Sequence, residues 1–335
     1  MEGVVVDKFG GSVLRRPQDI AAAVAAVAEQ RAAGLRPVVV VSAFEGVTDA
    51  ILASAAVLLP DDGAALRGLA HDSDSTFARE ADRALATGEA LSAALFALGL
   101  QAQGIAARSF SGAEAGIRTA AAHLGAEVRR VLPRRLRAAL TEGVVPVVAG
   151  FQGIGSHGEL TTLGRGGTDL SAVVLAVALR AERCELFKDV GGVMEADPQL
   201  VPGARLLSVV DALQLELLAE LGAEIVHPVA VRRARRGRLA LEVRALDASG
   251  ARTTVRARPP RGKASGGVLM LAVDRRQRTA RISLVGPAAM VPEQLPIPAH
   301  GAGSFDEGGF RVAWSEVPLE QAVPAAQAVH AALMA

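Results

Sequence analysis

The chain has 335 residues, of which 50% are hydrophobic, and its formal net charge at pH 7 is +1. A nearly neutral chain lacks the electrostatic footprint of a protein that binds nucleic acid or an anionic membrane, so we expect neither partner. Aromatic residues make up 3% of the chain and tyrosine is absent, which suits helices packed on a parallel sheet better than an aromatic-rich sandwich.

The cysteine content and the N-terminus indicate a cytoplasmic protein. Cys184 is the only cysteine, so no intramolecular disulfide can form, and its apolar neighbours predict a buried structural thiol. The N-terminus enters an apolar run without the basic and then apolar pattern of a signal peptide. No stretch is an uninterrupted, charge-free run of about 20 residues of the kind that crosses a membrane.

Strand, polar turn and helix alternate through the first half of the chain. Glycine or polar residues lie at the carboxyl ends of the predicted strands, at residues 4–6, 37–43, 105–108, 144–151 and 183–193. The periodicity predicts helices at residues 17–34, at 51–59, at 77–100 with an interruption at 87–89, and from 120 to about 141. A hairpin is expected at 153–162. The alternation predicts a parallel sheet with ligands at the carboxyl ends of its strands.

Residues 161–172 form a glycine-rich turn that opens an alanine- and valine-rich helix. Glycines let backbone N–H groups approach a ligand, and the start of the helix directs its positive dipole end to the same place. Arg165 adds a guanidinium that can grip a carboxylate or phosphate, and Asp169 adds a carboxylate. We interpret the segment as an anion-binding site. The alternative is a tight turn in which Thr168 or Asp169 only caps the helix.

A second glycine turn, Gly10-Gly11-Ser12, follows Lys8 at the end of the first strand. Backbone amides of such a turn can bind phosphoryl oxygens, and a lysine supplies a point charge. The lysine precedes the glycines, so this is not the Walker pattern. Taken alone, a lysine at a strand end followed by Gly-Gly is as often a plain turn as a phosphate-binding site. With residues 161–172, however, two anion cradles share one sheet edge, as phosphoryl transfer requires.

Beyond the main domain, expected at residues 1–250, composition changes. Residues 251–267 are basic and contain proline and glycine, which predicts a linker. The small α+β region at 268–335 contains no catalytic grouping. Its expected elements are strands at 268–273, 280–286 and 310–314, an irregular stretch at 287–309, and a helix at 319–334.

Seven blocks in one order give the chain a close resemblance to the aspartokinases of the amino-acid kinase superfamily. They lie at residues 8–13, 40–49, 88–92, 112–119, 150–169, 188–198 and 222–228. The resemblance spans residues 4–246 and implies an α/β fold, a three-layer sandwich around a largely parallel sheet. It also implies that the C-terminal appendage is a degenerate ACT-like region.

The resemblance implies transfer of the γ-phosphate of ATP, with Mg²⁺, to the side-chain carboxylate of L-aspartate, giving 4-aspartyl phosphate. The implied catalytic residues are Lys8, which would neutralise the moving phosphoryl group, and Asp169, which would orient Lys8 and the metal environment. The residues implied at ATP and its phosphates are Lys8, Gly10, Gly11, Ser12, Lys188, Asp189, Gly192 and Asp197. No general base is needed because the nucleophile is an ionised carboxylate.

For the amino acid, the resemblance implies that Arg165 clamps a carboxylate and that Glu89 pairs with the ammonium group. The full set implied at the substrate is Ser42, Thr48, Glu89, Arg165, Gly166, Gly167 and Thr168. No side chain is expected to bind a metal directly, since the histidines show no ligand spacing. Plain alternatives stay open, such as a helix-start acid for Glu89 and a turn former for Asp197. We expect a homodimer.

Three departures from the family pattern keep other functions open. The family's threonine is missing between Gly11 and Ser12, Phe44-Glu45 replaces small or basic residues, and the C-terminal region is too short for two ACT domains. We therefore expect no feedback inhibition by lysine or threonine. The alternatives are a superfamily kinase with a different acceptor, or a non-catalytic ligand-binding or regulatory descendant.

Overall fold

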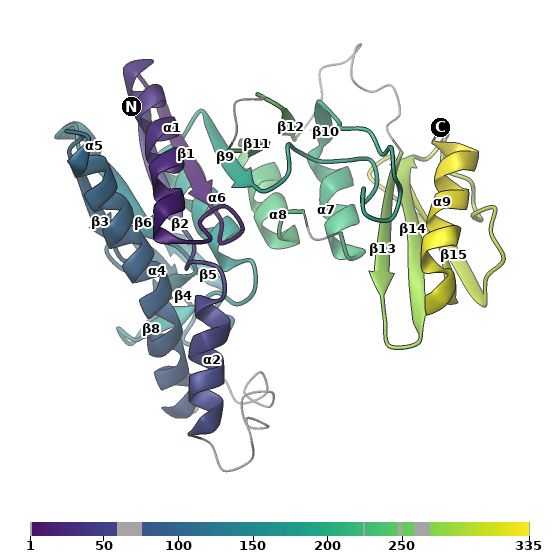
Figure 1. The fold of residues 1–335 in the computed structure, drawn as a ribbon, viewed down its shortest axis with the longest axis horizontal. Helices are drawn as coiled ribbons and strands as arrows, with labels where there is room; N and C mark the ends of the chain where they lie inside the picture. The colour runs from purple at the N-terminus through teal and green to yellow at the C-terminus, as the bar shows by residue number, and fades with distance from the viewer. Residues whose placement is uncertain (1, 59–75, 224, 247–249, 258–268, 335) are drawn as a thin grey trace. The chain divides into compact units, whose positions relative to one another are not determined.

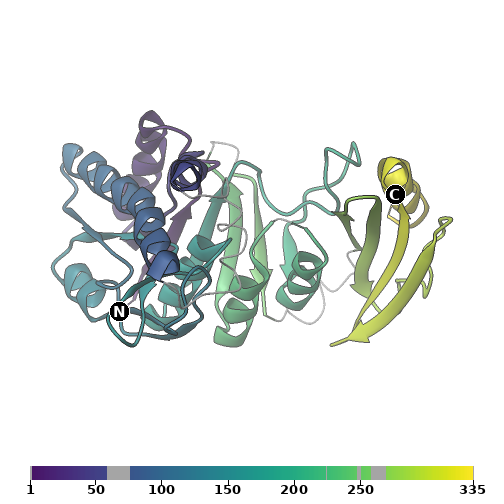
Figure 2. The same cartoon turned by 90° about the horizontal axis from the view of Figure 1, so that it is seen from below.

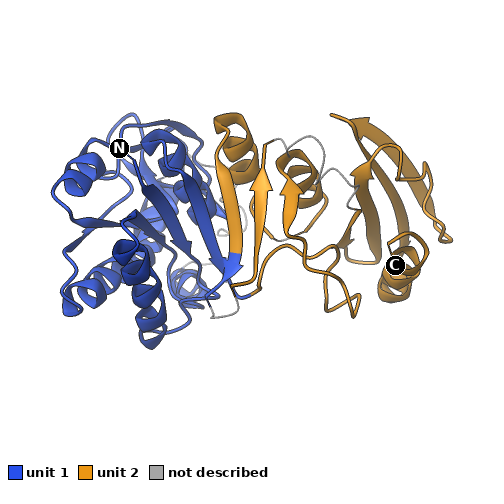
Figure 3. Ribbon diagram, turned by 90° about the horizontal axis from the view of Figure 1, so that it is seen from above, with its two compact units in different colours: residues 1–189, 244–249 blue, residues 190–243, 250–335 orange. Residues whose placement is uncertain are grey.

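The computed structural model describes residues 2–58, 76–223, 225–246, 250–257 and 269–334. Residues 258–268, which include most of the expected linker, lie outside this part. The chain forms two compact units, shown in blue and orange in Figure 3. The first comprises residues 1–189 and 244–249, and the second comprises residues 190–243 and 250–335.

The first unit is built on five parallel strands, which confirms the largely parallel sheet predicted from the sequence (Figure 1). In spatial order the strands are β9 (Arg183–Lys188), β1 (Val4–Phe9), β2 (Arg36–Val41), β6 (Val145–Ala149) and β3 (Ala107–Phe110). All of β1 and most of β2 are buried, because helices cover both faces of a parallel sheet. Cys184 on β9 is buried, which confirms the structural thiol.

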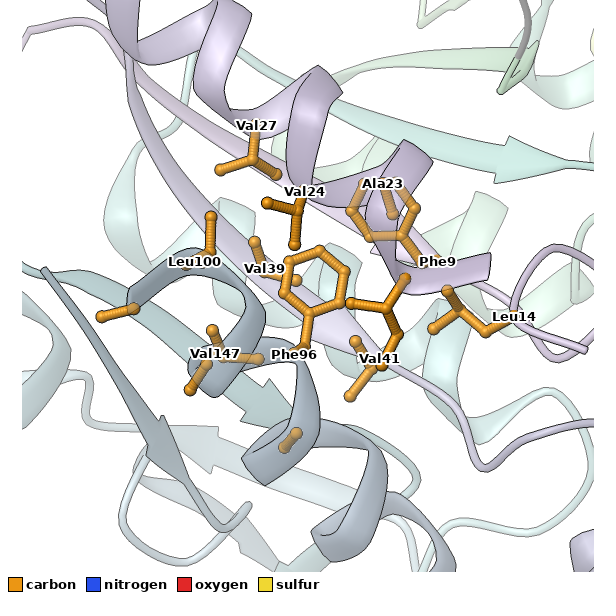
Figure 4. Close-up of a cluster of buried hydrophobic side chains, with 14 of the residues drawn as sticks. Phe9, Leu14, Ala23, Val24, Val27, Val39, Val41, Phe96, Leu100 and Val147 are labelled. Atoms are coloured by element: carbon orange, nitrogen blue, oxygen red, sulfur yellow. The ribbon is translucent and has the colours of Figure 1, made fainter. Parts of the chain in front are cut away.

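Helices on the two faces of this sheet complete the three-layer sandwich. On one face α1 (Ile20–Ala32) and α4 (Thr76–Ala102) enclose the apolar core, in which Phe9 and Phe96 lie among valine side chains (Figure 4). Phe9 also stacks on Phe187, at 4.6 Å between ring centroids. α6 (Gly167–Leu179) packs on β1 and β9. Each fully buried phenylalanine stabilises the fold by roughly 1.5–3 kcal/mol. The remaining helices in the described part of this unit are η1 (Pro17–Asp19), α2 (Val47–Val57) and α5 (Arg134–Thr141).

α4 is one continuous helix, so the interruption expected at residues 87–89 is wrong. Gly88 lies inside it because the missing side chain lets the helix approach Ala43: an added Cβ would lie 2.8 Å from the Ala43 Cβ. By length and composition α4 could cross a membrane, a property that it shares with core helices, and 50% of its apolar window is buried. It packs on β3 and β6.

A small second sheet lies in the first unit, and one of its strands lies where a helix was expected from residue 120. Its order is β5 (Val128–Val131), β4 (Ile117–Thr119), β7 (Gln152–Ile154) and β8 (Leu160–Thr162). Leu124 and Gly125 have positive φ angles of 59° and 159°, which breaks any helix before β5. Only α5 remains of the expected helix. The hairpin β7–β8 confirms the prediction for residues 153–162.

The second unit begins with a small α/β portion. It contains β10 (Val209–Asp211), α7 (Ala212–Glu220), α8 (Pro228–Gly237), β12 (Arg252–Arg256) and β11 (Ala240–Ala245), whose last two residues belong to the first unit. β12 forms within the stretch expected to be a linker, and it pairs with β10 in parallel. Its alternating burial, with Thr253 and Val255 inside, is the period-two pattern of a half-buried strand.

The C-terminal region folds as an antiparallel sheet with one helix on it. The sheet order is β13 (Met270–Arg275), β14 (Thr279–Pro287), β16 (Phe310–Pro318) and β15 (Gly301–Glu307), followed by η3 (Leu319–Gln321) and α9 (Ala322–Leu333). Figure 2 shows α9, in yellow, alongside these strands, and it contacts β13, β14 and β16. The stretch 287–309 is not wholly irregular, because β15 pairs with β16 along its whole length.

Candidate active site

Two lysines and one aspartate form the centre of the site. Lys8 on β1 and Lys188 at the end of β9 point to the face covered by α6, where Asp169 stands in the first helical turn. Lys8 Nζ lies 2.8 Å from Asp169 Oδ1, and Lys188 Nζ lies 3.1 Å from Oδ2. One carboxylate therefore holds two cations side by side.

The charges of this cluster depend on one another. Burial alone would raise the pKa of the Asp169 carboxyl, but the two ammonium groups outweigh it and hold that pKa well below its usual range. Burial lowers the pKa of Lys8, and Asp169 opposes this shift. The cluster carries a net charge of about +1 when all three groups are ionised, so it can attract an anion.

The turn after β1 brings backbone donors next to Lys8. A Cβ on Gly10 would lie 2.8 Å from Lys8 Nζ, and one on Gly11 would lie 3.2 Å from the Ala43 carbonyl oxygen. Gly10 therefore leaves room for the end of the Lys8 side chain, and Gly11 lets the turn approach the Ala43 carbonyl closely. Among the described residues, no acceptor is found for the N–H groups of Gly11 and Ser12. These donors are available to an anion that approaches Lys8.

The glycine-rich loop before α6 has the geometry expected of a helix start. Gly164 and Gly166 have φ angles of 74° and 73°, in the left-handed region that glycine enters freely. A Cβ on Gly167 would lie 2.8 Å from Leu163 Cβ, and Thr168 is buried beside Gly150. Arg165 is exposed and forms no ion pair with any described carboxylate, so its guanidinium is free for an external anion.

Glu89 is a buried carboxylate with one oxygen unused. Its Oε1 accepts the Ala43 N–H at 3.1 Å, while Oε2 is buried and has no hydrogen-bond partner in the described part of the chain. Burial raises the pKa of Glu89 to about 7, although the Ala43 N–H opposes the shift. Its burial excludes the exposed helix-start acid. Ser42 precedes Ala43, and Thr48 lies in the first turn of α2.

The residues predicted at the nucleotide divide between the units. Asp189 follows Lys188 at the end of the first unit and is exposed. In the second unit, Gly192 packs against Thr253, whose Oγ1 accepts the Val193 N–H at 2.8 Å. Asp197 is exposed and its Oδ1 accepts the Gln199 N–H at 2.8 Å, which is a local turn. Their roles at a nucleotide stay predictions.

Two buried carboxylates near the site were not singled out from the sequence. Asp7 faces Glu185 across β1 and β9, and Asp82 on α4 accepts hydrogen bonds from Thr162 and Leu124 and contacts His123. Asp82 could have been found, because it is a charged residue on the apolar face of an expected helix. Asp7 could also have been found, since it interrupts a buried strand.

Comparison with known proteins gives consistent matches over the first three quarters of the chain. Residues 3–244 match the sequence model of the Amino acid kinase family. The aspartokinase of Geobacillus stearothermophilus is 39% identical over 242 residues, which are 72% of this chain and 56% of that protein. That of Thermus thermophilus is 40% identical over 241 residues, with the same coverage of 72% and 56%. The chain thus spans about half the length of the curated relatives it matches.

Solved structures resemble the whole chain. E. coli aspartokinase III in complex with aspartate and ADP aligns with a TM-score of 0.80 at 20% identity, covering 99% of this chain and 100% of that one, which is a likeness of fold. Aspartate kinase from Synechocystis aligns with a TM-score of 0.65 at 31% identity, covering 98% of this chain and 55% of that one.

Proposed function

Because the chain belongs to the amino acid kinase family, we propose that it phosphorylates the side-chain carboxylate of L-aspartate with ATP. A carboxylate oxygen attacks the γ-phosphorus and forms a new O–P bond. The bond from that phosphorus to the β,γ-bridging oxygen breaks, so the products are 4-aspartyl phosphate and ADP. The observation that carries the proposal is the pair Lys8 and Lys188 held by Asp169 beside the Gly10–Ser12 turn.

The lysine pair supports phosphoryl transfer because the moving group spreads negative charge over its oxygens. Preorganised cations and backbone N–H groups stabilise such charge without reorganisation during the reaction. Asp169 holds the two lysines side by side and opposes the lowering of the Lys8 pKa by burial. Since both of its oxygens already contact ammonium groups, the proposal places Mg²⁺ on the phosphates of ATP, where it would neutralise charge. Asp189, Gly192 and Asp197 are proposed to bind the nucleotide.

The amino acid is proposed to lie between Glu89 and the glycine-rich loop. The unpartnered Oε2 of Glu89 would accept a hydrogen bond from the substrate ammonium group. A buried carboxylate is costly unless it is paired and hydrogen-bonded, so this contact would be favourable. Arg165 would bind a substrate carboxylate in a bidentate way. The remaining residues proposed to line the amino-acid site are Ser42, Thr48, Gly166, Gly167 and Thr168.

The cellular location, oligomeric state and regulation of the enzyme are also part of the proposal. The curated relatives are aspartokinases, which supports a cytoplasmic enzyme of amino-acid biosynthesis. We propose a homodimer that is not inhibited by lysine or threonine. Initial rates measured with each amino acid, at aspartate near its KM, test the last point.

A hydroxamate trap for acyl phosphate is the direct test of the reaction. We expect signal with MgATP and aspartate, and none with glutamate or N-acetylglutamate. Signal with glutamate or N-acetylglutamate instead would identify that compound as the acceptor in place of aspartate. No signal with any carboxylate would refute the acyl-phosphate reaction.

Two variants test the assigned roles. Lys8→Ala should lower kcat by about 100-fold or more, because a cation on the moving phosphoryl group acts mostly in the transition state. Arg165→Ala should chiefly raise the aspartate KM. Arg180→Ala is the matched control, since Arg180 is exposed at the other end of α6. An unchanged aspartate KM in Arg165→Ala would contradict the placement of the amino acid.

A further inference from the structure

Asp82 is a fully buried carboxylate to which no step of the reaction has been assigned. It lies on α4, and three groups from two other segments surround it. Thr162 Oγ1 donates to Oδ1 at 2.5 Å, the Leu124 N–H donates to the same oxygen at 3.1 Å, and His123 Nδ1 lies 2.7 Å from Oδ2. A buried carboxylate is costly unless it is hydrogen-bonded, so these contacts are strongly favoured in the folded state.

The contacts of Asp82 fix the start of the glycine-rich loop. Thr162 is the last residue of β8 and directly precedes that loop, residues 163–167. Its carbonyl oxygen accepts the Ala126 N–H at 2.8 Å. The turn that contains Leu124 also supports the loop, because a Cβ on Gly164 would lie 3.4 Å from Gly125 Cα. Asp82 therefore ties the loop and the turn behind it to α4.

The same helix carries Glu89, seven residues further along. Seven residues are almost two helical turns, so both side chains project from the same side of α4. Glu89 in turn accepts the Ala43 N–H, two residues after the end of β2. α4 thus serves as one rigid reference for two separate parts of the site, the loop that bears Arg165 and the carboxylate of Glu89.

We propose that Asp82 is a positioning residue that sets the glycine-rich loop against Glu89, with the Thr162 hydroxyl as the link. The inference rests on the proposed function, in which Arg165 and Glu89 grip opposite ends of one amino acid. Two groups that bind a single small substrate must keep a fixed separation, and a displacement of about 1 Å is enough to impair them.

The chain offers a matched pair of variants for the test. Thr162→Val keeps the shape of the side chain and removes only the hydroxyl that meets Asp82. Thr161→Val is the control, because Thr161 is the adjacent buried residue of β8 and its hydroxyl meets Thr119 at 2.7 Å instead. Loss of a hydrogen bond to a charged group is large enough to measure.

We expect Thr162→Val to raise the aspartate KM about tenfold, with the ATP KM and kcat changed less than threefold. Thr161→Val should leave the aspartate KM within about twofold of wild type, and Thr162→Ser should restore it. All rates are measured well below the melting temperature of each variant. Equal aspartate KM values for the two valine variants would overturn the proposal, as would a parallel rise in both KM values.

A second readout separates this inference from the proposed reaction. Amide hydrogen exchange of residues 163–167 reports the order of the loop without any turnover. It should be faster in Thr162→Val than in Thr161→Val. If wild type fails to phosphorylate aspartate but the two valine variants still differ in loop exchange, the proposed reaction is wrong and the positioning role of Asp82 stands. Equal exchange in the two variants overturns the positioning role, whatever the enzyme phosphorylates.

Discussion

Replacing Asp7 by asparagine should remove a pH dependence from the stability of the first unit. Asp7 on β1 lies opposite Glu185 on β9, and Gln30 donates to both carboxylates, at 3.1 and 3.3 Å. Oδ2 of Asp7 has no hydrogen-bond partner in the described part of the chain. Burial and the charge of Glu185 raise the pKa of Asp7 from 3.8 to about 8, so the folded protein keeps a proton that the unfolded chain releases.

The sign and size of the effect follow from this shift. The stabilising contribution is fully present below about pH 4 and is lost as the pH rises towards 8, because over that range only the folded state holds the proton. One such proton lowers the free energy of unfolding by about 1.4 kcal/mol for each pH unit. Between about pH 5.5 and 7.5 the loss is therefore roughly 2–3 kcal/mol.

Urea denaturation at several pH values measures this loss directly. Asp7→Asn keeps the shape of the side chain, accepts the Gln30 bond and can donate to Glu185, but it does not titrate. The difference in free energy of unfolding, variant minus wild type, should increase by about 2–3 kcal/mol as the pH rises from about 5.5 to 7.5. Asp49→Asn, at an exposed position, should follow wild type. A difference between Asp7→Asn and wild type that stays constant with pH would refute the reasoning.

Two further predictions concern substrate affinity. Wild-type affinity for aspartate should rise about tenfold from pH 6 to 8, since Glu89, with a pKa of about 7, must ionise to bind an ammonium group. Glu89→Gln should bind more weakly and show no such rise in a plot of KM against pH; a flat wild-type profile would contradict this role. Ending the chain after Arg256 should raise the ATP KM and increase binding of an apolar dye, because Leu200 and Val201 lose their core neighbours. An unchanged ATP KM in the shortened chain would count against this.

The sequence predicts those parts of the fold in which one local pattern dominates. Continuous apolar runs such as Val38 to Val41 are buried on both faces, and they form the parallel strands that were expected. The turn at Gly10 and the helix start at Gly167 also follow from local chemistry, since glycine leaves room for the close contacts at both positions. The lysine and aspartate of the site could be named because each follows a predicted strand or glycine loop.

Errors arose where a distant contact decides the structure. Gly88 looked like a helix break, but the approach of Ala43 makes glycine necessary inside α4. β15 contains two glycines and two acidic residues, which have low strand propensity, and its pairing with β16 makes it a strand. The shared carboxylate of Asp169 was likewise not predictable in full, because the contact of Lys188 with it depends on the register of β9 against β1.

The C-terminal region is part of the same core as a segment that the family resemblance places at the nucleotide. Apolar residues of that segment lie in one cluster with β13, β14 and α9: Ala196, Leu200, Val201 and Ala204. Backbone contacts add to this, since the Leu271 N–H donates to the Glu195 carbonyl at 2.7 Å and Gln327 Nε2 donates to the Leu200 carbonyl at 2.9 Å. A buried leucine or valine contributes roughly 1.5–3 kcal/mol, so segment and region unfold together.

This shared core determines how a ligand of the C-terminal region would act. Asp197 stands on the segment between Ala196 and Leu200, so any rearrangement of the α+β core moves the residue proposed to meet ATP. Coupling between two sites is reciprocal for binding free energies. A ligand of this region would therefore change the dissociation constant of ATP while leaving that of aspartate unchanged, and ATP would change the affinity for that ligand by the same factor.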